Sequence, residues 1–258
     1  MMKRLCVYAC AAMCVLALCR TCTAQSNPWN GSWKLDPSSL KFEGSTFSVA
    51  IDTDGITVTR GGEAQPKVVC DGTEHKSTDG ATLTCTMLAE GYEIVTSKDG
   101  NTTRKTWISI SGDSKTRISR AENFPADGEP FTTTVTSKRV SGGPGPAGVW
   151  KEVNFSSSQD SGVLSIAVNG DTVDFKETDA PKPVTCKLDC TEMKFPDGGS
   201  MAVKLADPHT LKVTYKGDDG KVRRENTFAL SEDGATIIET DVTPAPSLST
   251  MVVVLHKM

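Results

Sequence analysis

The sequence predicts an all-β protein made of two tandem antiparallel meander β-barrels, with two β-sandwiches as the alternative. Three observations predict this fold. Short segments alternate apolar and polar residues with the period of two that is typical of half-buried strands. Asp-Gly and Asn-Gly pairs, which tolerate the positive φ angles of hairpin turns, separate these segments. The whole pattern then occurs a second time along the chain, which indicates two copies of one unit.

The N-terminal segment predicts export. Met1–Arg4 carries positive charge, Leu5–Leu18 is an apolar run without an acidic residue, and Ala24 places a small residue before Gln25. This order is typical of a secretory signal peptide over residues 1–24, cleaved after Ala24. We therefore expect a secreted or periplasmic protein.

The composition of the remaining chain excludes two classes of protein. The predicted signal contains basic but no acidic residues, so the chain that follows it is more acidic than the full sequence, whose net charge is −4. Such a chain lacks the basic surface of a protein that coats nucleic acid. No later segment has the roughly 18 consecutive apolar residues of a membrane helix, so we expect no membrane span.

Strands are predicted along the whole chain that follows Trp33. The period-two segments are 47–51, 56–58, 83–87, 107–110, 164–168 and 211–215. Turns with glycine as second residue begin at Asp54, Asp71, Asp79, Asp99, Asp127, Asn169, Asp197, Asp219 and Asp233. Threonine fills polar-face positions, as over 132–136, which suits a half-exposed pleated surface. Because no segment has the periodicity of a helix of three turns, we expect consecutive strands to be joined by hairpins.

The internal repeat is visible as matching motifs at a nearly constant distance. Gly31-Ser32-Trp33-Lys34 returns as Gly148-Val149-Trp150-Lys151 after 117 residues. Asp99–Thr116 aligns without a gap with Asp219–Thr236 after 120 residues. Several ordered matches of this kind indicate that one strand meander is present twice.

The repeat predicts the domain boundaries. Residues 141–147 are rich in glycine and proline and have the composition of a linker, which leaves repeat domains over 25–140 and 148–258. An open meander of about eight strands has unpaired edges that invite aggregation, and closure into a barrel removes them. Closed or nearly closed barrels are therefore favoured over sandwiches.

The cysteines predict disulfides rather than a metal site. Five of the nine cysteines fall within the predicted signal, and the other four are Cys70, Cys85, Cys186 and Cys190. An even number in an exported chain indicates two disulfides, for which three connectivities exist. The pairs Cys70–Cys85 and Cys186–Cys190 are favoured, because each is local and lies within one repeat. Only His75 lies near a cysteine and no Cys-x₂-Cys pair occurs, so we expect no metal ion and no cofactor.

The motif at the start of each repeat resembles that of a known superfamily. Gly31-Ser32-Trp33 and Gly148-Val149-Trp150 each open a run of about eight strands that ends near a basic residue. This arrangement resembles the calycin superfamily, which comprises the lipocalins and their relatives. The first copy is similar to exported bacterial lipocalin-like domains that begin Gly-x-Trp-Lys-Leu-Asn/Asp, since residues 31–36 follow that pattern, Lys41-Phe42 comes shortly afterwards and 111–116 supplies a Ser-x-Asp-x-Lys-Thr turn.

The resemblance implies roles for four residues. In this superfamily the tryptophan closes one end of the barrel, and a basic residue of the last strand packs across it. Trp33 and Trp150 would therefore close the two barrels. Arg139 and Lys257, or their neighbours, would be the covering cations, in a cation–π contact of roughly 0.5–2 kcal/mol.

Candidate catalytic residues are absent from the sequence pattern. His75, His209 and His256 lie far apart in the repeat frame, and no nucleophile elbow, phosphate loop or His-Glu-x-x-His motif occurs. Isolated histidines are typical of loops and strand ends. We therefore expect a protein that is not an enzyme.

Two arginines are candidate ligand-binding residues. Arg104 and Arg224 occupy equivalent places in the two copies. Arg104 alternates in phase with Ile108, and Arg224 with Phe228, so the pattern favours side chains that point into the barrel. There they would bind a carboxylate by a bidentate contact. If they point outward instead, they pair with neighbouring acids.

These observations predict an exported, non-enzymatic protein that binds a small apolar or amphipathic ligand. The open end of a lipocalin-like barrel provides the space for it. The alternative is a structural or protein-interaction module whose barrels are filled by their own side chains. The sequence does not identify a protein partner.

Overall fold

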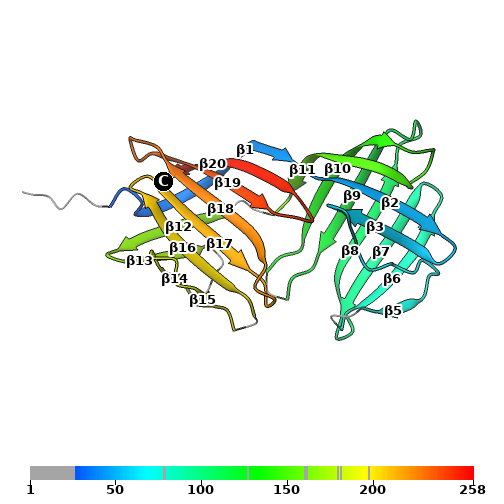
Figure 1. Ribbon diagram of the computed structural model, residues 1–258, viewed down its shortest axis with the longest axis horizontal. Helices are drawn as coiled ribbons and strands as arrows, with labels where there is room; N and C mark the ends of the chain where they lie inside the picture. The colour runs from blue at the N-terminus through cyan, green and yellow to red at the C-terminus, as the bar shows by residue number, and fades with distance from the viewer. Residues whose placement is uncertain are drawn as a thin grey trace, which may run out of the picture.

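The computed structural model describes residues 27–77, 80–126, 128–159, 162–178, 180, 182–196 and 198–258. The predicted signal peptide lies outside the described residues. The described chain is all-β, as predicted, and forms two antiparallel sheets of ten strands that lie side by side (Figure 1). In the parts of the chain that the structure describes, no helix is long and apolar enough to cross a membrane.

The sheet that we call the first barrel runs continuously along the chain. Its strands are β2 (Thr46–Asp52), β3 (Gly55–Arg60), β4 (Glu63–Ala64), β5 (Glu74–Lys76), β6 (Thr82–Leu88), β7 (Gly91–Lys98), β8 (Asn101–Ile110), β9 (Thr116–Asn123), β10 (Phe131–Ser141) and β11 (Gly148–Ser157). Their order in the sheet is β4-β3-β2-β11-β10-β9-β8-β7-β6-β5.

The second barrel combines the first strand of the chain with the C-terminal strands. Its members are β1 (Gly31–Glu43), β12 (Val163–Asn169), β13 (Thr172–Glu177), β14 (Val184–Lys187), β15 (Met193–Lys194), β16 (Ser200–Asp207), β17 (Thr210–Lys216), β18 (Val222–Leu230), β19 (Thr236–Thr243) and β20 (Ser249–Lys257). Their order is β14-β13-β12-β1-β20-β19-β18-β17-β16-β15.

The two sequence repeats have therefore exchanged their first strands. β11, which opens the second repeat, lies between β2 and β10 of the first, with Trp150 opposite Phe47 and Arg139. β1, which opens the first repeat, lies between β12 and β20 of the second, with Trp33 opposite Leu164 and Lys257. The registers are equivalent, so each strand occupies the place that the other would fill without exchange.

The exchange changes the folded units. The first barrel is a continuous segment inserted between β1 and β12 of the second barrel, which is discontinuous in sequence. The division into 25–140 and 148–258 describes the sequence repeats, whereas the folded units separate after β1 and again after β11. The chain crosses between barrels at Gly44, where an added Cβ would lie 2.3 Å from the Cβ of Glu152. The exchanged strands also meet through Phe42 and Phe155, whose ring centroids are 5.8 Å apart.

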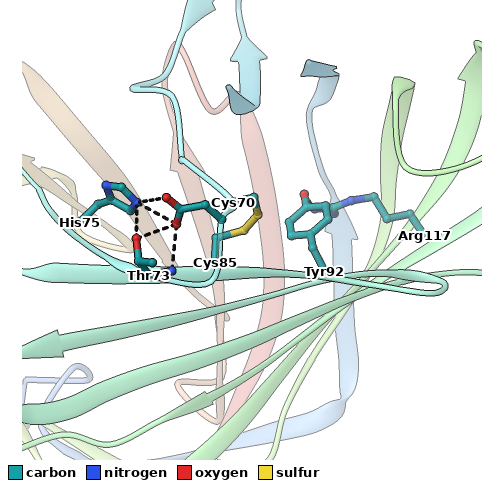
Figure 2. Close-up of a disulfide and its surroundings, with 7 residues drawn as sticks. Cys70, Thr73, His75, Cys85, Tyr92 and Arg117 are labelled. Carbon is teal, nitrogen blue, oxygen red and sulfur yellow. Dashed lines mark hydrogen bonds and ion pairs between the residues drawn. A yellow bond between two sulfur atoms is a disulfide. The ribbon is translucent and has the colours of Figure 1, made fainter. Parts of the chain in front are cut away.

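A disulfide closes the seam of the first barrel. Val68 exchanges backbone hydrogen bonds with Ile56 of β3 at 2.8 and 2.9 Å, and Gly72 donates to the carbonyl of Cys85 in β6 at 2.9 Å. Between these contacts Cys70 is bonded to Cys85, with a Cα–Cα distance of 4.4 Å (Figure 2). The predicted Cys70–Cys85 pair is confirmed, and it joins the two margins of the sheet.

The second barrel closes its seam without a disulfide. The amide of Cys190 donates to the carbonyl of Val203 at 2.9 Å, in the manner of Gly72 and Cys85. In this register Leu188 and Val203 stand where the first barrel has its two bonded cysteines. An apolar pair thus replaces the covalent link at this seam.

The predicted Cys186–Cys190 disulfide is wrong, because both thiols are free. Cys186 is buried opposite Val173 in the barrel wall. Cys190 is exposed and has a φ of 69°, at the turn position that Gly72 occupies with a φ of 77° in the first barrel. One thiol therefore faces the core, whereas the other belongs to a surface turn.

Candidate functional site

A buried tryptophan in contact with a basic side chain lies at one end of each barrel, which we call the closed end. Lys257 Nζ lies 5.0 Å from the ring centroid of Trp33, and the Arg139 guanidinium carbon lies 4.0 Å from that of Trp150. Both tryptophans are 0% exposed. Because the first strands are exchanged, each tryptophan meets the cation of the other sequence repeat.

Backbone carbonyls hold Arg139 in place. Its side chain donates to the carbonyls of Ser114 at 2.5 Å and Ala147 at 2.7 Å, and also to that of Gly145. All three guanidinium nitrogens of Arg139 therefore donate to the backbone around the closed end of the first barrel. For the first barrel, these contacts favour ligand entry from the end away from the tryptophan.

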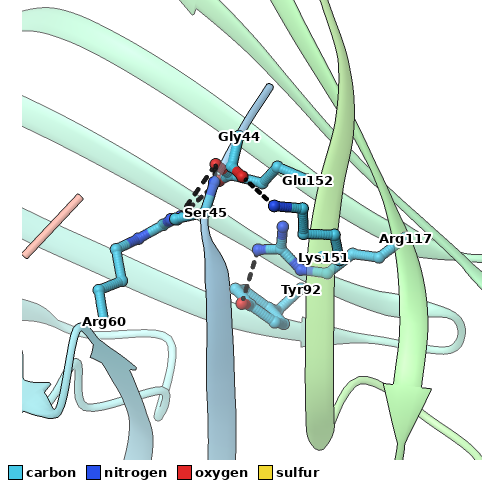
Figure 3. A network of polar contacts seen from close by, with 7 residues as sticks. All are labelled: Gly44, Ser45, Arg60, Tyr92, Arg117, Lys151 and Glu152. Atoms are coloured by element: carbon cyan, nitrogen blue, oxygen red, sulfur yellow. Dashed lines mark hydrogen bonds and ion pairs between the residues drawn. The ribbon is translucent and has the colours of Figure 1, made fainter. Parts of the chain in front are cut away.

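A buried arginine lies inside the first barrel near its closed end. Arg117 of β9 is 7% exposed, and its Nη2 lies 3.5 Å from the hydroxyl of Tyr92 (Figure 3). Its guanidinium carbon lies 5.1 Å from the ring centroid of Phe47. Arg117 Nε and the Oγ of Ser137, its cross-strand neighbour, are both buried without a hydrogen-bond partner. We call these four residues the Arg117 site.

The charge of Arg117 is not neutralised by the nearby acid. Arg60 lies over the same Phe47 ring at 4.4 Å, and its Nη2 forms an ion pair with Glu152 Oε1 at 2.7 Å. Glu152 also accepts from the amide of Ser45 at 3.2 Å. Within the described residues, Arg117 itself has no ion pair, so the two arginines and one glutamate leave an excess positive charge. Burying an unpaired charge is costly for the folded state.

The second barrel shows that the fold does not need this arginine. In the aligned registers Ile237 replaces Arg117, Leu211 replaces Tyr92 and Leu255 replaces Ser137. These three residues are only 0%, 0% and 2% exposed. The same place in the fold is therefore well filled by apolar side chains, and the polar set of the first barrel calls for a different explanation.

The first barrel is also less completely filled above the Arg117 site. Inward-facing Ile51, Ile94 and Val135 are partly exposed, whereas their counterparts Val168, Val213 and Val253 in the second barrel are buried. Small residues contribute to the difference, since Thr96, Thr106, Ser119 and Ala121 stand where the second barrel has Tyr215, Asn226, Glu239 and Asp241. Water therefore reaches apolar interior surface in the first barrel.

The candidate Arg224 points inward but is held by acids of its own chain. Its Nε lies 2.6 Å from Asp241 Oδ2, and its Nη2 lies 3.8 Å from Glu239 Oε1. Asn226 Nδ2 also donates to Glu239. Arg104, at the equivalent place in the first barrel, is exposed opposite Thr96 and forms no ion pair within the described residues.

Burial raises the pKa values of the acids around Arg224. The low polarity around Glu239 and Asp241 raises the pKa of both carboxyl groups, although Arg224 opposes the shift. Desolvation likewise raises the pKa of Tyr215. Two partly desolvated acids against one guanidinium make this interior acidic, opposite in sign to that of the first barrel.

The polar residues beside the disulfide form a surface turn. Asp71 Oδ1 accepts from the amide and the hydroxyl of Thr73 at 2.8 Å each, and lies 2.9 Å from His75 Nε2 (Figure 2). His75 is the main cause of the lowered pKa of Asp71. In the second barrel, His256 Nε2 lies 3.9 Å from Asp36 Oδ2. The described residues contain no group of three or more side chains suited to a metal ion.

Two surface hollows are lined by few charged groups. One of about 240 Å³ lies between the barrels, against Glu43, Lys151, Thr243 and Leu248. The other, of about 250 Å³, follows β12 and β13. Neither is lined by residues of the Arg117 site, which remains the stronger candidate.

Comparison of the chain with protein-family models and with curated proteins finds no match. The candidate site therefore depends on the geometry alone. Sequence reasoning missed Arg117, although a signal was present. The gap-free repeat alignment ended at Thr116 and Thr236, and the next pair sets Arg117 against Ile237 at an inward position.

Proposed function

We propose that the protein is an exported, non-enzymatic binding protein that holds a small amphipathic ligand with an anionic head group in its first barrel. We also propose that its barrels are lipocalin-like. The observation that carries the ligand proposal is the buried Arg117, whose charge has no counter-ion within the described residues.

The head group would meet three polar groups. Arg117 Nε and Ser137 Oγ have no partner, and the Tyr92 hydroxyl lies beside the guanidinium. A carboxylate accepts hydrogen bonds at both oxygens and matches the planar donors of an arginine. Binding would therefore remove the excess charge and satisfy the two unpartnered atoms together.

The tail would lie along the partly exposed apolar wall. Ile51, Ile94 and Val135 face the interior between the Arg117 site and the open end. Covering this surface would gain about 25 cal/mol for each Å² removed from water. The small cross-section of a single barrel favours one unbranched chain over a bulky ring system.

The alternative, a module filled by its own side chains, is supported by the second barrel. Its core cluster has fifteen buried apolar residues, compared with eight in the first. Around its closed end the second barrel is therefore packed by its own side chains. The proposal therefore assigns the anionic ligand to the first barrel alone.

The test compares Arg117→Ile with the unaltered protein in titration calorimetry with decanoate. Isoleucine is the residue that the second barrel carries at this place, so the variant should fold with equal or greater stability. Its Kd for decanoate should rise more than tenfold, because a charge-assisted contact is lost. Decanol should bind both proteins alike.

Arg104→Gln provides the matched control, since Arg104 lies in the same barrel on the exposed rim. This variant should bind decanoate as the unaltered protein does. Equal decanoate affinity of the unaltered protein and the Arg117→Ile variant would overturn the proposal, and so would a failure of the unaltered protein to bind decanoate.

A further inference from the structure

We propose that the second barrel binds a small organic cation, such as a protonated primary amine, at the acidic cluster formed by Glu239, Asp241 and Asn226 with Arg224 and Tyr215 at its rim. This site is separate from the Arg117 site, takes a ligand of opposite charge and does not depend on the proposed function. It rests on a shortage of hydrogen-bond donors and of positive charge inside this barrel.

The cluster faces the barrel interior from neighbouring strands. Asn226 of β18 lies opposite Asp241 of β19, and Phe228, two residues further, lies opposite Glu239. Asn226 is 2% exposed, and the side chains of Asp241 and Glu239 are 12% and 14% exposed. Arg224, at 48%, is the most open member and marks the side from which a ligand would enter.

Few hydrogen-bond donors of the protein reach the two carboxylates. Arg224 Nε bonds Asp241 at 2.6 Å, while its Nη2 is 3.8 Å from Glu239 and contributes charge rather than a hydrogen bond. The amide nitrogen of Asn226 donates to Glu239. One guanidinium and one amide therefore serve two carboxylates.

Asn226 supplies an independent indication of a missing donor. Its Oδ1 is buried and accepts no hydrogen bond. Turning the amide over would place this oxygen against the Glu239 carboxylate, so the observed orientation is the favourable one. A buried acceptor without a donor is uncommon in folded proteins and calls for an explanation, such as a missing ligand.

Other groups around the cluster add negative charge or aromatic surface. Glu177 of β13 is close enough to raise the pKa of Glu239. The Arg224 guanidinium carbon lies 5.7 Å from the ring centroid of Tyr215 on β17, so the aromatic face is within reach of a cation at the rim. A protonated amine carries up to three N–H donors and one positive charge, which are what this interior lacks.

The first barrel again provides the internal comparison. Thr106, Ser119 and Ala121 replace Asn226, Glu239 and Asp241 there, while Arg104 keeps the place of Arg224. The same barrel therefore forms without carboxylates at these positions. An arginine at this place does not need acid partners either, since the equivalent Arg104 of the first barrel is exposed and forms no ion pair within the described residues.

The ligand would compete with protons for the carboxylates. Burial raises the pKa of Glu239 and of Asp241 above the ordinary values, so acidification that protonates them removes the attraction for a cation. The charged and titratable groups that face the cluster are Glu177, Tyr215, Arg224, Glu239 and Asp241. Of these, Arg224 stays charged, so the net charge of the cluster changes from negative to positive as the pH falls.

The experiment is titration calorimetry of the full chain with n-butylammonium at pH 8 and pH 4. We expect one bound amine at pH 8, with affinity at least tenfold weaker at pH 4. Glu239→Gln keeps the size of the side chain and should weaken binding at pH 8 at least tenfold, and Asp241→Asn is a second variant should the first fail to fold. Butyrate and n-butanol at the same concentrations should not bind at this site.

Two controls separate the outcomes. Ser119→Ala, at the position equivalent to Glu239, should bind the amine unchanged, and so should Arg117→Ile, whose defect concerns the other barrel. The proposal is overturned if n-butylammonium does not bind at pH 8, or if both acid variants bind it as tightly as the unaltered protein. Calcium binding in place of the amine would also overturn it, because the site would then be a metal site.

Discussion

Separating β1 from the rest of the chain should leave the second barrel unfolded, whereas the first barrel should fold alone. The two fragments that test this are 158–258, which holds β12–β20, and 45–157, which holds β2–β11. Without β1, the strands β12 and β20 lose the partner between them and become exposed edges. A peptide of residues 27–44 added to fragment 158–258 should restore the fold.

The magnitude follows from the burial of Trp33. The ring is 0% exposed, and truncation of a buried tryptophan to alanine costs about 3–5 kcal/mol. A peptide carrying Trp33→Ala should therefore bind the fragment roughly 150- to 4,000-fold more weakly than the natural peptide. Trp29 is also buried, and its indole donates to the carbonyl of Pro208 at 3.0 Å, so it remains as a reporter in the altered peptide.

The assay uses tryptophan fluorescence. The four tryptophans of the chain are Trp29, Trp33, Trp107 and Trp150, so fragment 158–258 has none and all the signal comes from the peptide. Complex formation should shift the emission to the blue as the indoles leave water, and circular dichroism should report strand recovery. The reasoning is refuted if fragment 158–258 unfolds cooperatively without peptide at the same urea concentration as in its presence.

Two further predictions concern the barrel seam and acid stability. Replacing Cys70 by Leu and Cys85 by Val, the residues of the other seam, should give a folded protein whose urea midpoint is insensitive to dithiothreitol. Reduction of the natural chain should lower its free energy of unfolding by about 3 kcal/mol, for a loop of 15 residues. Equal sensitivity of both proteins to dithiothreitol would contradict this prediction. Hydrogen bonds from Lys216, at 2.6 Å, and from Lys194 and Ser200 lower the pKa of Glu192 to about 2. This carboxylate therefore stabilises the fold above its unfolded pKa near 4.5, and the contribution is lost as the pH falls toward 2. Glu192→Gln should flatten that part of the profile of thermal midpoint against pH, and an unchanged profile would count against the ion pair.

The all-β class and the first disulfide could be predicted because both depend on local sequence. The Asp113 turn shows how local the information is: Ser111 Oγ bonds Asp113 Oδ1 at 2.6 Å, and Ser231 Oγ bonds Asp233 Oδ1 at the same distance. Each turn is determined by a few consecutive residues. Cys70 and Cys85 are likewise joined across one seam within a single repeat.

The strand exchange could not be predicted from the same patterns. β11 pairs with β2 through Trp150 and Phe47, and β1 pairs with β12 through Trp33 and Leu164. Phe47 and Leu164 are both apolar and stand in equivalent registers, so either first strand satisfies the alternation of either barrel. Only contacts outside the repeat pattern distinguish the arrangements, and Glu152 with Arg60 is one such contact.

The prediction of a second disulfide was wrong for a related reason. The spacing of Cys186 and Cys190 suits a local staple when it is considered alone. In the repeat register, however, Cys190 occupies a turn position with positive φ and Cys186 occupies a core position, so the two side chains belong to opposite sides of the wall. Placing the cysteines in the repeat alignment before pairing them would have shown the conflict.

Duplication explains why function should be sought in the interior. The turns and the tryptophan–cation contacts are kept in both barrels, while the inward positions differ in polarity and charge. Arg117 is equivalent to Ile237 in the repeat alignment, and Ser119 is equivalent to Glu239. A residue required for closing a barrel would be expected in both copies, because both close in the same way. Charges that occur in only one interior are unnecessary for that closure and costly to bury. The opposite signs of the two interiors therefore favour two binding sites of different ligand charge over one site present twice.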